Sequence, residues 1–511
     1  MKNVRKSKYW LYNKYFEDGV LWDNTILFES FGGSNFQGNP YYMFRYYFED
    51  IEYQEWKFII VHKNPCMLES WLKKRKLWDS RIRIVEIATE EYINALSHSK
   101  FLINNVGFGM NFIKKSGQVY LNTWHGTPLK TLGRDVKGDT FSCNNAQRNM
   151  LLADILLAPN EFTQRNYLYG HMIHDIHPGN MVLNGYPRNS IFLDDEACEN
   201  VKKRYHLEQK KTIFYMPTWR GNACHVDDVN QISEIERLAK DLGEEYQVFV
   251  KFHPAMMNKD VKFQYCYPMP EDIEVYEFLN GMDILITDYS SVFFDFAIKN
   301  KPIILYQYDK ESYFADRGIY KEVENQICFQ TVYNFEDLKQ AVVDEVGVDY
   351  SEFNDNFGKY GSIDSPKQLA KLVRQIPEKR GKSEPVDLYI IDFPVEEKTL
   401  LRWKKQLEKR KRNYRFLFLL GSNSWYFNKI KNWDQFDYFC TYYSNNLSFK
   451  EKIQYIIYSR MIIGSEKVQY FEKREQIRLW GYTNIGHIYT KSKKLPVALK
   501  YSSEAWPKDL R

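Results

Sequence analysis

The sequence lacks several features that define common classes of protein. Its seven cysteines are scattered, odd in number and without a C-x-x-C pair, which indicates reduced thiols rather than a disulfide framework or a zinc site. No apolar run approaches the roughly 18 residues that a membrane span needs. The basic N-terminus lacks the apolar stretch and cleavage site of a signal peptide. We therefore expect the chain to stay in the cytoplasm.

Signatures of metal and nucleotide binding are also scarce. The chain has no Walker A loop and no G-x-G-x-x-G segment. His171, His174 and His177 recur at intervals of three, but such positions drift around a helix and no carboxylate cluster accompanies them. We expect no metal site there and no required cofactor. Whether Asp288 and Asp295 hold Mg²⁺ stays open.

Positive charge is unevenly distributed. The 511 residues have a net charge of +5, yet residues 401–511 hold 23 Lys and Arg against 9 Asp and Glu. The first 400 residues are therefore net negative. This asymmetry indicates an anionic partner for the C-terminal end.

Short apolar runs alternate with helical stretches, which is typical of parallel sheets covered on both faces. A first group of β-rich runs lies at residues 26–28, 57–61, 82–85, 101–103, 119–121 and 154–158. A second group lies at residues 213–215, 248–250, 284–286 and 303–305. After a charged linker at residues 376–385, a third group comprises strands at residues 386–391 and 416–420 and a basic helix at residues 396–412.

The chain is too long for a single core, so we predict an α/β protein with several domains. Residues 1–195 and 196–378 are expected to form two doubly wound, Rossmann-like domains that face a cleft, which is the GT-B-like architecture. Residues 386–511 would form a small basic α/β accessory module. In such sheets ligands bind at the carboxyl ends of the strands.

One segment has the composition of a catalytic turn. The apolar run 119–121 ends in a polar turn with a single imidazole, His125, and Gly126 allows a tight bend behind it. Pro128 then predicts the start of a helix, whose free N–H groups favour an anion. This arrangement suits the handling of a hydroxyl proton beside an anion. The alternative is a buried histidine that closes a turn.

Residues 121–134, Leu-Asn-Thr-Trp-His-Gly-Thr-Pro-Leu-Lys-Thr-Leu-Gly-Arg, belong to an ordered series of segments. They resemble the hallmark of the CDP-glycerol glycerophosphotransferase family, the teichoic-acid primases and polymerases of Gram-positive bacteria. The resemblance extends over roughly residues 25–375 and implies the GT-B arrangement. Its other segments follow in the family's order at residues 28–30, 38–40, 185–189, 217–220, 251–254 and 287–291.

The resemblance implies a reaction. A polyol phosphate, with glycerol phosphate the leading choice, would pass from a CDP-activated donor to an acceptor hydroxyl with release of CMP, in the synthesis of teichoic acid, a related surface phosphopolymer or a capsule. Such transfer needs deprotonation of the hydroxyl, neutralisation of the nonbridging oxygens and stabilisation of the leaving group. We assign the base to His125, because an ordinary histidine pKa of about 6.5 suits that role.

The second half of the chain is expected to bind the donor. His253, just after the strand at residues 248–250, would hydrogen-bond the pyrophosphate, with a simple turn histidine as the alternative. Asp288 or Ser290 would cap the helix after residues 284–286. The free N–H groups of that helix and the hydroxyls of Ser290 and Ser291 would then receive a phosphate. The expected donor-binding residues are Arg220, Lys251, His253, Asp288, Ser290 and Ser291.

Five positions of the first half complete the expected site. Glu29, counted with His125 and His253 as catalytic, and Asn39 would position the acceptor or steady His125; Glu29 has the alternative of capping a helix. Lys130, in the same segment as His125, is a further candidate position. Arg188 and Asn189 resemble a family motif, and the alternative is that they fasten the crossover between the domains.

The basic C-terminal module has three interpretations. Docking to an anionic membrane surface or to a polyanionic product is preferred, because the acceptor of this family is lipid-linked or polymeric. A solvated helix face is the alternative, and nucleic-acid binding ranks last because no recognised DNA or RNA motif is present. The residues concerned are Trp403, Lys404, Lys405, Lys409, Arg410, Lys411 and Arg412.

The sequence therefore favours a cytoplasmic transferase, peripheral on the inner face of the cell membrane. Two alternatives stay open: a GT-B glycosyltransferase that uses a nucleotide sugar, and a non-catalytic subunit that binds phosphate. The sequence does not separate glycerol from ribitol phosphate, primase from polymerase, or wall polymer from capsule. Acceptor identity and oligomeric state are equally open.

Overall fold

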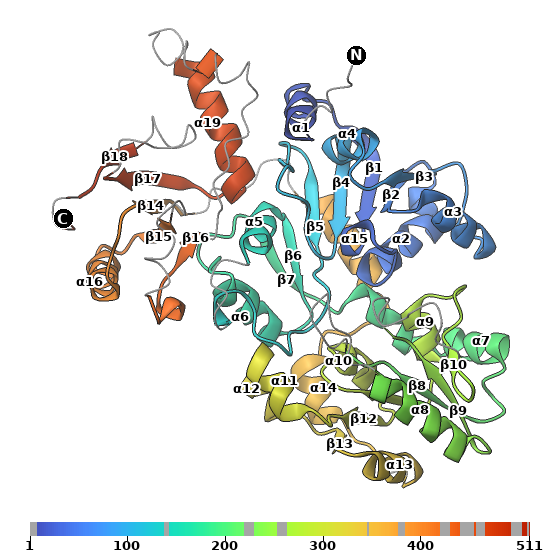
Figure 1. The fold of residues 1–511 in the computed structure, drawn as a ribbon. Helices are drawn as coiled ribbons and strands as arrows, with labels where there is room; N and C mark the ends of the chain where they lie inside the picture. The colour runs from blue at the N-terminus through green and yellow to red at the C-terminus, as the bar shows by residue number, and fades with distance from the viewer. Residues whose placement is uncertain are drawn as a thin grey trace, which may run out of the picture.

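Three parallel β-sheets organise the residues that the structure describes (Figure 1). The computed structural model describes residues 8–136, 143–218, 229–252, 263–344, 347–376, 384–418, 430–439, 454–455, 465–491, 503–507 and 510. No helix in these ranges is long and apolar enough to cross a membrane. The predicted α/β class with parallel sheets is confirmed.

The first sheet has seven strands in the order β3-β2-β1-β4-β5-β6-β7. All six apolar runs predicted in this part are strands, and the unpredicted β7 is a short edge strand with little burial. The strands are β1 Trp22–Glu29, β2 Lys57–His62, β3 Ile82–Glu86, β4 Ser99–Asn104, β5 Val119–Asn122, β6 Ile155–Ala158 and β7 Asn180–Leu183. The helices are α1 Lys8–Glu17, α2 Asn39–Glu49, α3 Pro65–Lys74, α4 Glu90–His98, α5 Asn144–Leu152 and α6 Glu161–Gly170.

Local capping explains where several of these helices begin. The side chain of Asn64 accepts a hydrogen bond from Met67 N, and Pro65 follows it at the first turn of α3. Thr89 caps α4, and Asn160 caps α6, each through its side-chain oxygen. These caps lie in the loops between strands and helices, as an alternating pattern requires.

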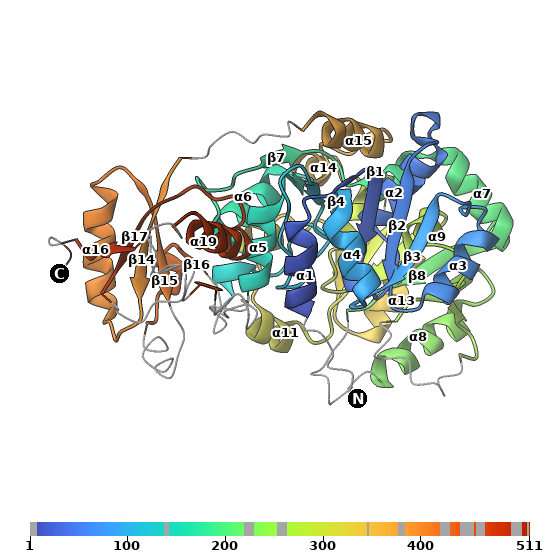
Figure 2. The same ribbon diagram turned by 90° about the horizontal axis from the view of Figure 1, so that it is seen from above.

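The second sheet has six strands in the order β10-β9-β8-β11-β12-β13. Its strands are β8 Lys211–Tyr215, β9 Tyr246–Val250, β10 Tyr267–Pro268, β11 Ile284–Thr287, β12 Ile303–Tyr306 and β13 Gln330–Val332. Its helices are α7 Asp195–Tyr205, α8 Val229–Leu242, α9 Val275–Asn280, α10 Val292–Phe296, α11 Lys310–Arg317, α12 Lys321–Glu324, α13 Phe335–Val343, α14 Ser351–Phe357 and α15 Ser365–Gln375. The last of these, α15, returns to pack on α2 beside the first sheet (Figures 1 and 2).

The third sheet has five strands in the order β16-β15-β14-β17-β18. One face packs on α5 and α6, so these helices lie between the first and third sheets (Figure 2). The predicted basic helix is α16, which ends four residues before the predicted end at 412. The elements are β14 Val386–Ile391, α16 Glu397–Glu408, β15 Asn413–Phe418, β16 Tyr438–Phe439, α19 Ser465–Trp480, β17 Ile485–Thr490 and β18 Ser503–Ala505.

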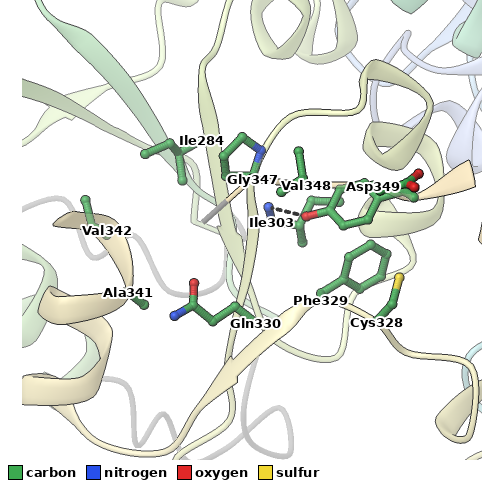
Figure 3. A pocket seen from close by; sticks show the side chains of 12 residues that line it. Ile284, Ile303, Cys328, Phe329, Gln330, Ala341, Val342, Gly347, Val348 and Asp349 are labelled. Atoms are coloured by element: carbon green, nitrogen blue, oxygen red, sulfur yellow. Dashed lines mark hydrogen bonds between the residues drawn. The ribbon is translucent and has the colours of Figure 1, made fainter. Parts of the chain in front are cut away.

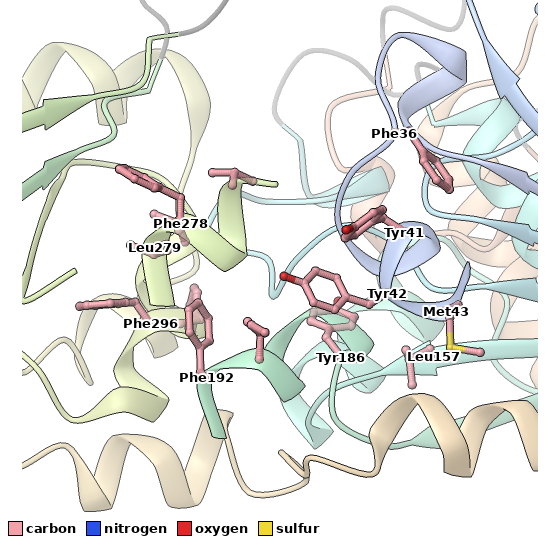
Figure 4. Packing of buried hydrophobic residues seen from close by; sticks show 14 of the residues in the cluster. Phe36, Tyr41, Tyr42, Met43, Leu157, Tyr186, Phe192, Phe278, Leu279 and Phe296 are labelled. Atoms are coloured by element: carbon pink, nitrogen blue, oxygen red, sulfur yellow. The ribbon is translucent and has the colours of Figure 1, made fainter. Parts of the chain in front are cut away.

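The first two sheet units share one apolar core. Tyr41 and Tyr42 of α2 lie on one side of this cluster, and Phe278 of α9 and Phe296 of α10 lie on the other (Figure 4). Phe192 of the 3-10 segment η4, Pro187–Leu193, lies between them. Because this contact is buried and apolar, the two units are held in direct contact rather than joined only by the chain.

The helix predicted from Pro128 is wrong. The chain there is extended instead: Lys130 forms an antiparallel bridge with Ile319, and Leu129 O accepts a hydrogen bond from Tyr320 N. A short 3-10 turn, Gly133–Asp135, follows. Pairing with the second unit satisfies the backbone groups that a helix would otherwise have satisfied, so tertiary contacts override the local preference.

Candidate active site

The predicted catalytic turn lies at the carboxyl end of β5. Trp124 adopts a left-handed backbone with φ 51°, which is strained for a bulky residue. Its N–H donates to Asn122 Oδ1 at 2.9 Å. The Trp124 ring stacks on the imidazole of His125 with the ring centroids 4.6 Å apart. These contacts therefore hold the backbone and the ring of His125 in a fixed position.

The hydrogen bonds of His125 define which ring nitrogen can accept a proton. Nδ1 lies 3.0 Å from the carbonyl oxygen of Asn105. A carbonyl only accepts, so Nδ1–H donates to it, and Nε2 is the unprotonated nitrogen of the neutral ring. Desolvation by the surrounding protein atoms lowers the pKa of His125, and the Arg188 guanidinium lowers it further. The hydrogen bond to the Asn105 carbonyl acts in the opposite direction. The side chain nevertheless remains exposed to solvent. His125 is thus neutral at pH 7, as a base must be.

The His125 turn lies directly against the second unit. A Cβ atom added at Gly126 would lie 3.2 Å from Cβ of Ser291, which follows β11. The Oγ of the neighbouring Ser290 accepts from Val292 N at 3.4 Å, but the N-cap residue of α10 is Ser291, whose side chain makes no capping hydrogen bond, so Ser290 is not the cap residue that the sequence predicted. The carboxyl edges of the first and second sheets therefore meet at His125 and the serine pair.

Asp288 has a different role from the helix cap that the sequence suggested. Its carboxylate accepts from the N–H of Thr218, at 2.8 Å, and from the Thr218 hydroxyl and the Tyr289 N–H. These bonds tie the loop after β8 to the loop after β11. Asp288 is buried, so its contribution is to hold Thr218 in place.

Lys251 follows β9 on the same edge of the second sheet and is half-buried. Burial lowers the pKa of its ammonium, and the carboxylate of Glu274 opposes that effect. His253 and Arg220 lie outside the described residues, so their predicted roles stay predictions. The described chain reaches Thr218 and Phe252 at this edge, the last described residues before each of them.

Glu29 ends β1 and is buried behind the turn. Its carboxylate accepts from the Tyr92 hydroxyl at 2.7 Å and from Asn104 Nδ2 at 3.2 Å, so it does not serve a helix N-terminus. Burial raises the pKa of Glu29 to about 7, against both hydrogen bonds. Asn104 precedes Asn105, whose carbonyl holds His125. This chain of contacts favours steadying His125 over touching the acceptor.

Asn39 also steadies the turn. Its Nδ2 donates to Trp124 O at 3.3 Å, and its Oδ1 accepts from Arg188 N at 3.3 Å. Lys130 instead lies at the bridge to the second unit, with Nζ 5.3 Å from the centroid of the Tyr313 ring.

Arg188 and Asn189 fasten the two units, which is the alternative that the sequence left open. Arg188 is buried between the rings of Tyr186 and Tyr276, each with its centroid 4.8 Å from the guanidinium carbon. Its Nη2 pairs with Asp295 Oδ2 at 2.7 Å, and Asn189 Nδ2 donates to Asp295 Oδ1 at 2.9 Å.

The positions considered for metals are engaged elsewhere. The oxygens of Asp295 accept from Arg188 and Asn189, and those of Asp288 accept from backbone and hydroxyl groups, so both carboxylates already have hydrogen-bond donors in the described chain. The histidines spaced three residues apart do not converge on a common site. His174 Nε2 lies 3.3 Å from Asp437, and His177 Nε2 lies 3.0 Å from Met150 O. The described ranges contain no group of three or more His, Cys, Asp or Glu that could hold a metal.

A cavity of about 490 Å³ lies at the opposite edge of the second sheet (Figure 3). Ile284, Ile303 and Gln330, the first residues of β11, β12 and β13, line it together with Cys328 and Phe329. Because ligands of parallel sheets bind at the carboxyl ends, this cavity is not the reaction site.

Sequence reasoning missed Asn105 and Tyr276, and it named Asp295 only as a metal ligand. A signal for Asn105 was available. It directly follows β4, and β1 and β4 are the neighbours at which the strand order of the first sheet reverses. Asp295 and Tyr276 had no such signal, because only the tertiary contact brings them to Arg188.

Fold and site together define a class: α/β proteins in which a histidine turn at one sheet edge meets a serine pair at another. Residues 12–375 match the sequence model of the family described as CDP-Glycerol:Poly(glycerophosphate) glycerophosphotransferase. The chain belongs to this family.

Named relatives and solved structures agree with this assignment. The teichoic acid poly(glycerol phosphate) polymerase of Staphylococcus epidermidis is 29% identical over 72% of this chain and 52% of its own, and that of Bacillus subtilis is 28% identical over 69% and 48%. The chain thus spans about half the length of these curated relatives. The structure of the wall teichoic acid polymerase TagF has a TM-score of 0.60 with 26% identity, covering 72% of this chain and 93% of that one. The fold is therefore similar to that of TagF and GT-B-like.

Proposed function

We propose that this chain transfers a polyol phosphate, with glycerol phosphate the first choice, from a CDP-activated donor to an acceptor hydroxyl in the synthesis of teichoic acid or a related phosphopolymer. The observation that supports it most is the contact of the His125 turn with Ser291 across the two units. A structure of a TagF histidine variant soaked with CDPG, at a TM-score of 0.60 to this chain, supports the choice of donor.

In the proposed arrangement the first two units are Rossmann-like domains of a GT-B enzyme, with the acceptor on the His125 side and the donor on the side of the second sheet. Nε2 of His125 takes the proton of the acceptor hydroxyl as its oxygen attacks the donor phosphorus. The new P–O bond forms while the bond to the CMP oxygen breaks, and CMP leaves with the electron pair.

The developing charge is met by groups of the second unit. The hydroxyls of Ser290 and Ser291 and the ammonium of Lys251 supply donors at the edge that faces His125. His253 and Arg220 are proposed to add to them at the pyrophosphate. Glu29 and Asn39 steady the turn rather than touch the reacting atoms. We propose that the reaction requires no cofactor. Whether its rate depends on Mg²⁺ is a separate measurement.

The direct test is CMP release from purified protein with CDP-glycerol or CDP-ribitol and a lipid-linked or polymeric acceptor. We expect release above background with one of the two donors. His125→Asn is expected to lower the rate by roughly 10²- to 10⁴-fold, the usual worth of a general base. Donor affinity, measured by calorimetry, is expected to stay unchanged. Stabilisation by UDP-sugars in place of CDP-polyols would make the chain a glycosyltransferase, and binding without turnover would make it a non-catalytic subunit.

We also propose that the third sheet unit docks on the anionic inner face of the membrane. Trp403, which the sequence placed in the docking set, is buried, whereas the outer face of α16 and the segment after it expose one basic cluster: Lys398, Arg402, Lys405, Lys409, Lys411 and Arg412. We expect the protein to sediment with anionic vesicles but not with neutral ones, and the double substitution Arg402→Glu and Lys405→Glu should weaken this binding. Equal binding to both vesicle types would refute electrostatic docking.

A further inference from the structure

Side chains from three different elements hold the catalytic turn through its backbone. Trp124 O accepts from Asn39 of α2, His125 O accepts from Arg188 Nη1 of η4 at 2.7 Å, and Gly126 O accepts from the hydroxyl of Tyr167 of α6 at 3.5 Å. Three successive carbonyl oxygens thus have side-chain donors. A turn that contains a strained residue persists only where its surroundings over-determine it.

Arg188 is the one of these three donors that also reaches the second unit. Its Nη1 donates to His125 O, and its Nη2 pairs with Asp295 of α10 at 2.7 Å. The hydroxyl of Tyr276 donates to the same Asp295 oxygen at 2.8 Å. Arg188 and Asp295 are each about 2% exposed, so the ion pair is desolvated and its geometry is held by packing. Asp295 lies four residues after Ser291.

From these contacts we propose that the Asp295–Arg188 ion pair is a positioning device, which sets the distance between the base His125 and the serine pair that receives phosphate. The pair joins the backbone of His125 to α10, the helix that follows the serines. Neither residue touches substrate. This inference rests on the proposed function for its effect on rate, but its structural part does not depend on the identity of the donor.

The same pair acts on the charge state of His125. Desolvation lowers the pKa of His125 most, the Arg188 guanidinium lowers it further, and the Asp295 carboxylate lies behind that cation. The other described groups in contact with the ring or the turn are neutral: the Asn105 carbonyl, the Trp124 and Phe31 rings and, against the turn, Ser291. His253 and Arg220, which lie outside the described residues, are unchanged in every variant below.

We therefore expect the pKa of His125 to shift in opposite directions when Arg188 and when Asp295 is replaced by a neutral residue. Arg188→Gln removes the cation, so the pKa of His125 rises and the acid limb of kcat/KM moves to higher pH. Asp295→Asn keeps the shape but leaves the cation uncompensated, so the limb moves to lower pH. Arg188→Lys keeps the charge and loses the second donor, so the limb stays in place while kcat falls by roughly 10- to 100-fold, because small misplacements of a catalytic group are costly.

The experiment titrates the histidines by NMR in the full chain, without substrate, and assigns His125 from the spectrum of His125→Asn. The rate profile is measured in parallel. Arg165→Gln is the matched control: Arg165 also pairs with a carboxylate of the second unit, Glu322, but on the surface. It is expected to change neither the titration nor kcat.

Shifts of the same sign in Arg188→Gln and Asp295→Asn, or no shift in either, would overturn the inference. If Asp295→Asn does not fold, Arg188→Gln and Arg188→Lys still decide between charge and position. Failure of the proposed function is a separate outcome: wild-type protein would release no CMP, yet the NMR titration would still show whether the pair acts on His125.

Discussion

The buried carboxyl of Glu29 makes the stability of the first unit depend on pH in a calculable way. Burial raises the pKa of Glu29 from 4.5 to about 7. The folded state therefore holds a proton that the unfolded chain has already released between these two values. Stability must fall as the pH rises from about 4.5 to about 7 and then level off. The substitution Glu29→Gln removes this loss.

The magnitude follows from linkage at 1.36 kcal/mol per pH unit. For pKa values of 4.5 unfolded and about 7 folded, the cost of ionising Glu29 is about 0.8 kcal/mol at pH 5 and about 3.3 kcal/mol at pH 8. In the variant, the Gln oxygen can accept from Asn104 Nδ2 while its amide donates to the Tyr92 hydroxyl, which then loses the acceptor of its own O–H. That loss is independent of pH. Relative to wild type, Glu29→Gln should thus gain about 2.5 kcal/mol between pH 5 and pH 8.

The assay is urea unfolding of both proteins at pH 5 and pH 8, with hydrogen exchange of the β1 and β4 amides, since a protein with three sheets need not unfold in one step. Glu86→Gln, at an exposed carboxyl at the end of β3, is the control and is expected to have the same effect at both pH values. If the stability of Glu29→Gln relative to wild type did not change between pH 5 and pH 8, or if it fell, the reasoning would be refuted.

Two glycines yield further predictions. Gly126→Ala places a Cβ 3.2 Å from the Cβ of Ser291, so we expect kcat to fall by about 10- to 100-fold with little change in thermal stability; an unchanged kcat would contradict the contact of the two units at this turn. Gly481 has φ 62°, and a Cβ there would lie 2.1 Å from Leu151 O, so Gly481→Ala should destabilise the contact of α19 with α5 by more than about 2 kcal/mol. Gly347→Ala, with nothing within 4 Å, is the control, and equal melting temperatures for these two variants would refute the packing argument.

Much of the fold could be predicted from local pattern. The runs that became β1, β4 and β11 are continuous and apolar because a central parallel strand is buried on both faces. β10 and β13 were missed because two- and three-residue strands carry no periodicity. The helix expected from Pro128 was wrong for a different reason: the segment pairs with Ile319, which is distant in sequence.

The candidate site divides in the same way. His125 and the serine pair stood out because each follows a strand and has chemistry suited to phosphate transfer. The roles of Arg188 and Asp288 did not, since a cation and a carboxylate near a motif equally suit ligand binding and internal pairing. Only the burial of Arg188 between two tyrosine rings, and the bonds from Asp288 to Thr218, decide for internal pairing.

By itself the sequence determined the α/β class, the family and the residue types at the sheet edges, because strand burial and motif order are properties of short segments. The tertiary structure alone decided which atoms meet: that Asn105 sets the tautomer of His125, that Asp295 reaches the turn through Arg188, and that Gly126 lies on Ser291. These contacts join residues up to 165 positions apart (126 to 291). No local pattern records the atoms that meet, because these contacts depend on how strands, loops and helices that are separated in sequence pack together.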